Sequence, residues 1–193
     1  MDHFIIVSGF TQQKWAKHGN GSITIYKNVR MLLADVGNIE FALLEWHEDP
    51  EGYAKFVSEH YSEGDKIVIA AYSYGGGFWL RVFLRTLKKI APHIKVDVIV
   101  VCDPVLRFDF MLLRPLSLLR NKLKLNFGNV KKAVHFLQTV NRPGGNALLL
   151  DDDVEYEGPR ELNYPHVKID NCVEYHDAVL SVAADLFLKD EEV

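Results

Sequence analysis

Residues 66–77 read KIVIAAYSYGGG, and this stretch decides the fold. The apolar run 67–72 lacks polar alternation, which is typical of a central parallel strand buried on both faces. The run ends on Ser73, which has the small residues Ala71 and Gly75 two positions away on either side, and a helical pattern follows at once. This order predicts a nucleophile elbow, a tight strand-to-helix turn in which small residues let the two backbone arms pass closely.

Apolar strands and amphipathic helices alternate along the rest of the chain, which predicts an α/β fold. We expect a three-layer α/β/α sandwich around a mostly parallel sheet of about six strands. The expected strands are 4–8, 39–46, 67–72, 96–102 and 133–140, with 147–150 and 166–169 as further candidates. The expected helices are 28–36, one opened by Asp49 and Pro50, one after the elbow, and 176–188, with a loop over 11–22.

Composition excludes several classes of protein. The chain has 193 residues, of which 48% are hydrophobic and 25% charged, as in an ordinary globular domain. The net charge of -4 gives no reason to expect a nucleic-acid partner. Two cysteines, Cys102 and Cys172, form neither a disulfide framework nor a zinc or redox motif. The N-terminus does not resemble a signal peptide, and no apolar run approaches the ~18 residues that span a bilayer, so we expect a cytoplasmic protein.

A serine hydroxyl is a weak nucleophile, so Ser73 needs a base, a group that orients the base, and donors for an oxyanion. The backbone N–H of Tyr74, the next residue, is one candidate donor. The sequence Ser8-Gly9-Phe10 follows the first strand, and there the N–H of Phe10 is the second candidate.

The candidate acid is Asp103, because it ends the strand 96–102 and reacting groups gather at the carboxyl ends of parallel strands. The alternatives are Asp151, Asp152 and Asp153. These three residues are also typical of a solvated acidic loop or a weak cation site.

Position along the chain reduces eight histidines to a few candidates for the base. His3, His60, His93 and His135 precede strands or lie inside expected elements, which leaves His18, His47, His166 and His176. The chain order nucleophile, acid, histidine retains His166 and His176. We favour His176, since it closes a loop and opens the last helix, and His166 remains the alternative. His47 is a candidate to line the pocket.

The segments FIIVSGF, IAAYSYGGG, VIVVCDPV and YHDAVLSVAADLFL together resemble the α/β-hydrolase superfamily, in its compact lipase and esterase form. The resemblance covers essentially the whole chain. It implies a single α/β-hydrolase domain over 1–193, a triad of Ser73, Asp103 and His176, and neither cofactor nor metal. Ala71 stands where the first elbow glycine is usual, and Ser8 where many members have a histidine. The acid of the family more often lies one strand later, where this chain has Asn141.

The expected function is cleavage of a small carboxylic ester through an acyl-enzyme on Ser73. Alternatives are an acyltransferase or thioesterase on the same triad, lyase chemistry without an acyl-enzyme, and a non-catalytic interaction protein with this fold. Residues 104–129 are a candidate lid or cap. Within them, 107–124 mix large apolar side chains with Arg and Lys, a pattern that favours either transient membrane contact or an ordinary covering helix with a basic outer face.

Overall fold

The structure, a computed structural model, describes residues 1–10, 20–106, 122–125, 127–140 and 144–189. Its centre is a six-stranded sheet with the strand order β2-β1-β3-β4-β6-β8, in which every neighbouring pair is parallel. The strands are β1 (Asp2–Val7), β2 (Ile39–Leu44), β3 (Ile67–Tyr72), β4 (Val96–Cys102), β6 (Val130–Gln138) and β8 (Glu155–Leu162). A second, two-stranded sheet pairs β5 (Lys122–Lys124) with β7 (Ala147–Leu149).

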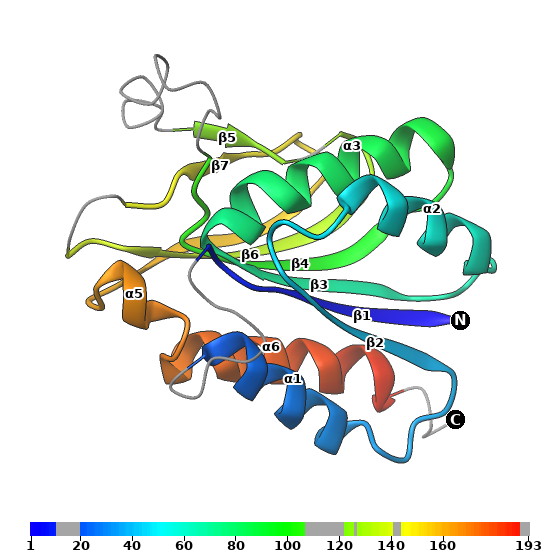
Figure 1. The fold of residues 1–193 in the computed structure, drawn as a ribbon, viewed down its shortest axis with the longest axis horizontal. Helices are drawn as coiled ribbons and strands as arrows, with labels where there is room; N and C mark the ends of the chain where they lie inside the picture. Colours follow the sequence, from blue (N-terminus) through cyan, green and yellow to red (C-terminus); the bar gives the residue numbers. More distant parts are fainter. Residues whose placement is uncertain (11–19, 107–121, 126, 141–143, 190–193) are drawn as a thin grey trace.

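Helices cover both faces of the main sheet (Figure 1). One face carries α1 (Gly21–Leu32) and α6 (Val173–Phe187). The other carries α2 (Pro50–His60) and α3 (Leu80–Ile90), and α3 continues the five-residue π-helical turn η1 (Gly75–Trp79). A single turn, α5 (His166–Ile169), lies between β8 and α6. The prediction of an α/β fold with a six-stranded parallel sheet is confirmed.

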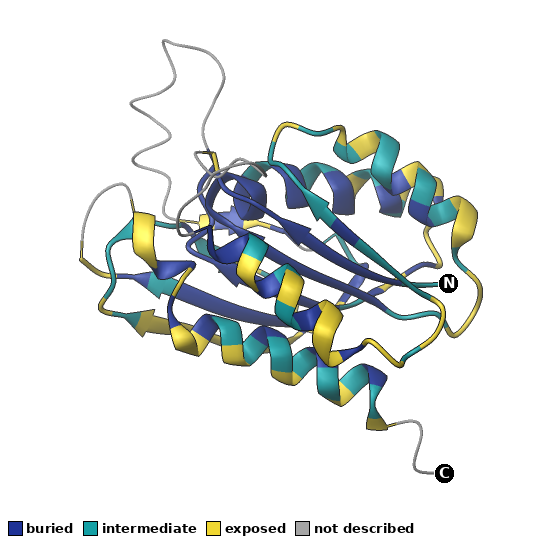
Figure 2. Cartoon of the chain, turned by 60° about the horizontal axis from the view of Figure 1, so that its bottom comes forward, coloured by how far each residue is buried: buried dark blue, intermediate teal, exposed yellow. Residues whose placement is uncertain are grey.

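The sheet separates two apolar layers, and β3 contributes to both. Its central strands are buried (Figure 2). Ile67, Ile69 and Ala71 pack toward α2 and α3, whereas Val68 and Tyr72 pack toward α1 and α6. Every residue of β3 is therefore buried, which is why its sequence shows no polar alternation. Burying an isoleucine or valine side chain stabilises a fold by about 1.5–3 kcal/mol, so burial fixes the position of this strand and of the residues that follow it.

Side-chain caps define where two helices begin. The Asp49 carboxylate accepts from the N–H of Glu51 at 3.0 Å, and Pro50 fills the first turn of α2, as the sequence predicts. By contrast, α1 begins at Gly21, inside the range expected to be a loop and well before residue 28. The N–H of Gly21 donates to the buried carboxylate of Asp170 at 2.9 Å. Asn20 is the N-cap of α1, and its side-chain oxygen accepts from the N–H of Ile23 at 3.3 Å, a local cap that the expected loop over 11–22 overlooks.

The last third of the chain differs most from expectation. Residues 147–150 do contain a strand, β7, but it pairs with β5 outside the main sheet. The range 166–169 is the helix α5, so the strand expected there is wrong. The sixth strand of the sheet is instead β8, which is largely exposed and rich in charge. Charged residues and proline protect an edge strand from pairing with other chains, and they also remove the apolar alternation by which strands are recognised.

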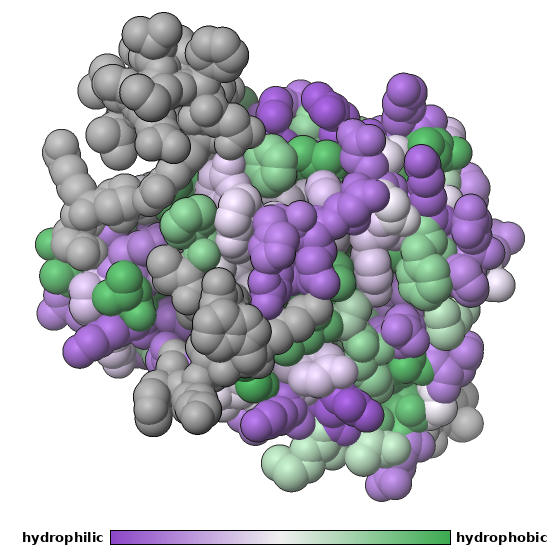
Figure 3. Space-filling view, in the orientation of Figure 1, coloured by the Kyte–Doolittle hydropathy of each residue, from purple (hydrophilic) through white to green (hydrophobic). Residues whose placement is uncertain are grey.

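Hydrophilic residues gather over the loop between β2 and α2 and along α2 (Figure 3). Among the described residues, no helix combines the length and apolar character needed to cross a membrane.

Of the candidate lid 104–129, residues 107–121 and 126 lie outside the described residues. In the remainder, Val105 and Leu106 are buried at the start of the segment, and β5 lies near its end.

Candidate active site

Ser73 follows the last residue of β3 and lies in the turn between the strand and η1. Its backbone has a φ of 53°, a left-handed conformation that costs a non-glycine residue roughly 1–2 kcal/mol. The carbonyl of Ser73 accepts a 2.9 Å hydrogen bond from the N–H of Val105, in the loop after β4, which helps to hold this conformation. Only 6% of the residue is exposed. The serine therefore has the strained strand-to-helix turn expected of an elbow.

The glycines after the serine let neighbouring loops approach the turn. A Cβ on Gly75 would lie 2.6 Å from the carbonyl oxygen of Ser8, in the loop after β1. A Cβ on Gly77 would lie 2.0 Å from the carbonyl oxygen of Val105. Real Cβ atoms do not come so close, so the loops after β1 and β4 reach Ser73 only because these positions have no side chain.

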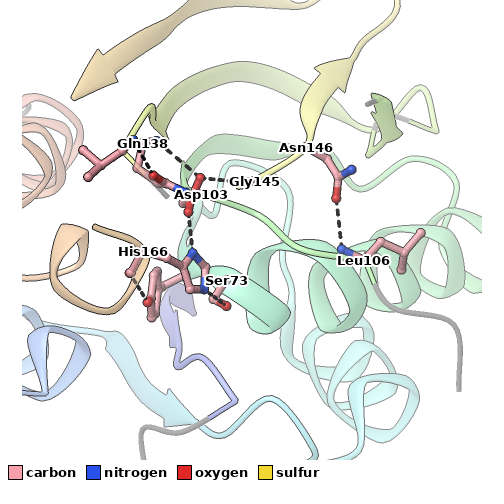
Figure 4. A network of polar contacts seen from close by, with 9 residues as sticks. Ser73, Asp103, Leu106, Gln138, Gly145, Asn146 and His166 are labelled. Carbon is pink, nitrogen blue, oxygen red and sulfur yellow. Dashed lines mark hydrogen bonds and ion pairs between the residues drawn. The ribbon is translucent and has the colours of Figure 1, made fainter. Parts of the chain in front are cut away.

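A continuous set of hydrogen bonds joins Ser73, His166 and Asp103 (Figure 4). Oγ of Ser73 lies 2.8 Å from Nε2 of His166, while Nδ1 of His166 bonds Oδ2 of Asp103. An ionised carboxylate only accepts hydrogen bonds, so Nδ1 carries the ring proton and Nε2 of the neutral imidazole accepts from the serine hydroxyl. The imidazole is 13% exposed and the carboxylate fully buried.

The backbone holds the second oxygen of Asp103. Oδ1 accepts from the N–H of Gly145 at 2.7 Å and from the N–H of Gln138 at 3.3 Å. These bonds compensate for taking the carboxylate out of water. The alternative acids, Asp151 to Asp153, are exposed, and the carboxylate of Asp151 lies 4.0 Å from the Lys124 ammonium. The structure therefore brings Asp103, the predicted acid, next to the histidine.

His176 lies in the first part of α6, where its Nε2 bonds the backbone carbonyl of Asp170 at 2.7 Å. The expectation that His176 lies beside Ser73 is therefore wrong. The physical reason is that α6 begins at Val173, so His176 is already inside the helix and bonds the end of α5. His166, the alternative base, is the first residue of α5 and faces the serine.

Comparisons of this chain with family models, with curated proteins and with solved structures found no match.

The remaining candidate histidines lie elsewhere or outside the described residues. His47 is exposed, and its Nδ1 lies 3.5 Å from a carboxylate oxygen of Glu45. His18 falls within 11–19, which the structure does not describe. His135 is buried in β6, where its Nδ1 bonds the Tyr156 hydroxyl at 2.9 Å, and burial lowers its pKa to about 4. These positions leave His166 as the histidine that contacts Ser73 in the described part of the chain.

Both predicted oxyanion segments adjoin the serine. A Cβ on Gly9 would lie 3.0 Å from Cβ of Ser73, so the loop that carries Phe10 contacts the elbow directly. Tyr74 is the next residue along the chain and precedes η1. The Trp46 ring packs against both, with ring centroids 5.0 Å from Phe10 and 4.9 Å from Tyr74. The donation of the Phe10 and Tyr74 N–H groups to an oxyanion stays a prediction.

Within the described ranges, no set of three or more His, Cys, Asp or Glu side chains is arranged to hold a metal ion. Cys102 and Cys172 are both free and buried, and burial raises the pKa of the Cys172 thiol to about 11. A buried thiol that stays protonated is a poor nucleophile, whereas the Ser73 hydroxyl lies beside a histidine, so Ser73 is the candidate nucleophile among these described residues.

Proposed function

We propose that this protein is a serine hydrolase of the α/β-hydrolase kind, which cleaves carboxylic esters through an acyl-enzyme on Ser73. The hydrogen-bonded series Ser73, His166 and Asp103 supports the proposal most strongly. All three residues follow strands of the parallel sheet at its carboxyl edge, where open α/β sheets bind their ligands.

In the acylation step, Oγ of Ser73 attacks the ester carbonyl carbon as its proton passes to Nε2 of His166. Asp103 keeps the imidazole oriented and stabilises the imidazolium that forms. The negative charge moves to the carbonyl oxygen, which the N–H groups of Tyr74 and Phe10 bind. The tetrahedral intermediate then collapses, the carbon–oxygen bond to the alcohol breaks, and Nε2 returns its proton to the departing alkoxide.

In the deacylation step, water takes the place of the alcohol. Nε2 of His166 removes a proton from the water as the water oxygen attacks the acyl carbon. The bond between the acyl carbon and Oγ of Ser73 then breaks, and Nε2 returns the proton to Oγ. The products are a carboxylic acid and an alcohol. The partly exposed aromatic surface of Phe10 and Trp46 beside the serine favours an ester with an apolar group.

The test combines a chain-length series of p-nitrophenyl esters with a fluorophosphonate that labels activated serines. We expect the native chain to hydrolyse at least one ester and to be labelled at Ser73. Ser73→Ala removes both signals, and mass spectrometry of the native chain after rapid quenching finds the acyl group on the peptide that contains Ser73. Adding a competing alcohol or amine shows whether another acceptor replaces water.

Labelling that persists in Ser73→Ala would falsify the assignment of the nucleophile. A folded native chain that neither reacts with the fluorophosphonate nor cleaves any ester or thioester contradicts the hydrolase function and favours a non-catalytic interaction protein.

A further inference from the structure

Tyr72 is the last residue of β3 and stands immediately before the serine. Its phenol hydroxyl donates a hydrogen bond of 2.5 Å to the backbone carbonyl of His166. Its ring also packs against the His166 imidazole, with centroids 5.4 Å apart and planes tilted by 30°. One side chain thus contacts both the backbone and the ring of the histidine that faces Ser73.

We propose that Tyr72 is a positioning residue that sets the orientation of the His166 imidazole toward Ser73. The inference rests on the proposed function for its catalytic consequence, although the contacts themselves do not depend on it. Because Tyr72 and Ser73 are consecutive residues at the end of one buried strand, the same backbone fixes the nucleophile and the support of its base.

The histidine needs such support because its own helix is short. α5 has four residues, and Pro165, which precedes it, makes no side-chain cap hydrogen bond. A single helical turn has little stability of its own, so tertiary contacts must decide where it lies. A bond from β3, at the centre of the sheet, to the first residue of α5 restricts the position from which the imidazole projects.

Tyr72 also adjoins the loop after β1. A Cβ on Gly9 would lie 2.7 Å from both Cδ1 and Cε1 of the Tyr72 ring, so the ring lies directly against the backbone of this loop. The next residue is Phe10, the second candidate oxyanion donor. The Tyr72 ring therefore lies in contact with two parts of the site, the loop after β1 on one side and the base on the other.

The phenol keeps its proton in this setting. Tyr72 is only 4% exposed, and burial, with smaller contributions from Asp170 and Cys102, raises the pKa of its hydroxyl well above the usual value. The hydroxyl remains a neutral donor, and its role is to hold the carbonyl of His166 rather than to exchange a proton with substrate.

The experiment compares Tyr72→Phe with the native chain on two esters of the same acid, one with an alkyl alcohol and one with p-nitrophenol. A poor alkoxide leaving group needs the proton from His166, whereas p-nitrophenolate departs without it. Because His166 is also the base for the attack of Ser73 and of water, we expect kcat to fall about 10–100-fold on both esters, with the larger loss on the alkyl ester and KM unchanged. Tyr53→Phe is the matched control. It removes a buried hydroxyl of α2 that has no hydrogen-bond partner among the described residues, and it leaves both rates unchanged.

A second readout is independent of turnover. The proton between His166 Nδ1 and Asp103 gives a downfield NMR resonance that His166→Gln abolishes, and Tyr72→Phe broadens or shifts it. An unchanged resonance in Tyr72→Phe overturns the inference, whether or not the protein cleaves esters. A loss of kcat that is fully matched by a smaller fraction of Ser73 labelled at the end of the fluorophosphonate reaction also overturns it, because that pattern reports loss of folded protein. If the native chain cleaves no ester, the proposed function fails, and the resonance alone decides whether Tyr72 positions the imidazole.

Discussion

The backbone N–H of Gly145 donates a 2.7 Å hydrogen bond to Oδ1 of Asp103, so the carboxylate is held from the side opposite His166. Gly145 fits this place because it has no side chain. A Cβ there would lie 2.4 Å from the same oxygen and 2.7 Å from Cα of Asp103. The orientation of the acid thus depends on a residue that carries no reactive group.

Gly145→Ala is therefore expected to displace Asp103 and lower kcat by about 10–100-fold, since a misplacement of about 1 Å in a catalytic arrangement can cost 10²-fold. Gly37→Ala is the control, because no atom in the described part of the chain lies within 4 Å of the Cβ that it adds. Steady-state kinetics on a p-nitrophenyl ester measure both variants. Equal activity of the two would show that the Gly145 contact does not hold the acid.

Asp103→Asn is expected to lower kcat by on the order of 10⁴-fold, because the amide no longer fixes the proton on Nδ1 of His166. Asp152→Asn, in the exposed acidic loop, should leave kcat within about twofold of the native value, as is usual for a surface change away from the site. Measuring kcat of both variants on one ester shows whether Asp103 or the acidic loop supplies the carboxylate of the site. A large loss in Asp152→Asn with little in Asp103→Asn would reverse the assignment.

Substitution of His166 is expected to lower the catalytic rate, whereas substitution of His176 is expected to lower only the stability of the fold. His166→Gln removes the group 2.8 Å from Oγ of Ser73 and should lower kcat by at least 10³-fold; it also removes the imidazole bond to the buried Asp103 carboxylate, so it should cost about 1.5–3 kcal/mol of stability. His176→Gln breaks the bond to the carbonyl of Asp170 and should cost about 0.5–1.5 kcal/mol of stability, while kcat stays within about threefold. Urea unfolding and ester kinetics on the two variants give these quantities. If kcat fell more in His176→Gln than in His166→Gln, His176 and not His166 would be the base.

Buried His135 is expected to make the fold sensitive to mild acid. Burial lowers its pKa to about 4, whereas the pKa in the unfolded chain is 6.5. Between these values the unfolded chain binds more protons, so stability is full above pH 6.5 and falls as the pH drops toward 4. From pH 7 to pH 5 this group alone should cost about 2 kcal/mol.

Urea unfolding of the native chain and of His135→Phe at pH 7 and pH 5 measures this cost. The pH-dependent loss should be about 2 kcal/mol smaller in the variant, whatever its stability at pH 7. Parallel losses in the two proteins would mean that another group carries the pH dependence.

The sequence predicts the centre of this fold better than its edge. The expected ranges 67–72 and 96–102 are the observed β3 and β4. Both are buried central strands, where the environment dictates apolar residues throughout. Ser73 and Asp103, which follow these strands, were for the same reason placed correctly.

The base was misplaced because β8 was missed. Its sequence, EYEGPREL, carries charge on both faces and a proline, so only pairing with β6 makes it a strand. Without β8, residues 166–169 are themselves a candidate strand, and His176 is preferred because it is expected to open the last helix, which in the structure already begins at Val173. The fixed chain order of nucleophile, acid and base still reduced the choice to two histidines, one of which faces the serine.

The order of the strands also determines how the site would fail under stress. Ser73 and Asp103 follow the central strands β3 and β4, whereas His166 follows β8, which pairs with β6 alone at the rim of the sheet. Edge strands fray before central ones, so a partial opening of β8 would withdraw the imidazole while the two apolar layers stay folded. Activity would then be lost at a lower temperature or denaturant concentration than the fold, and it would return fully on cooling or on dilution of the denaturant. Local unfolding of the outermost strand would thus set the upper temperature limit of activity.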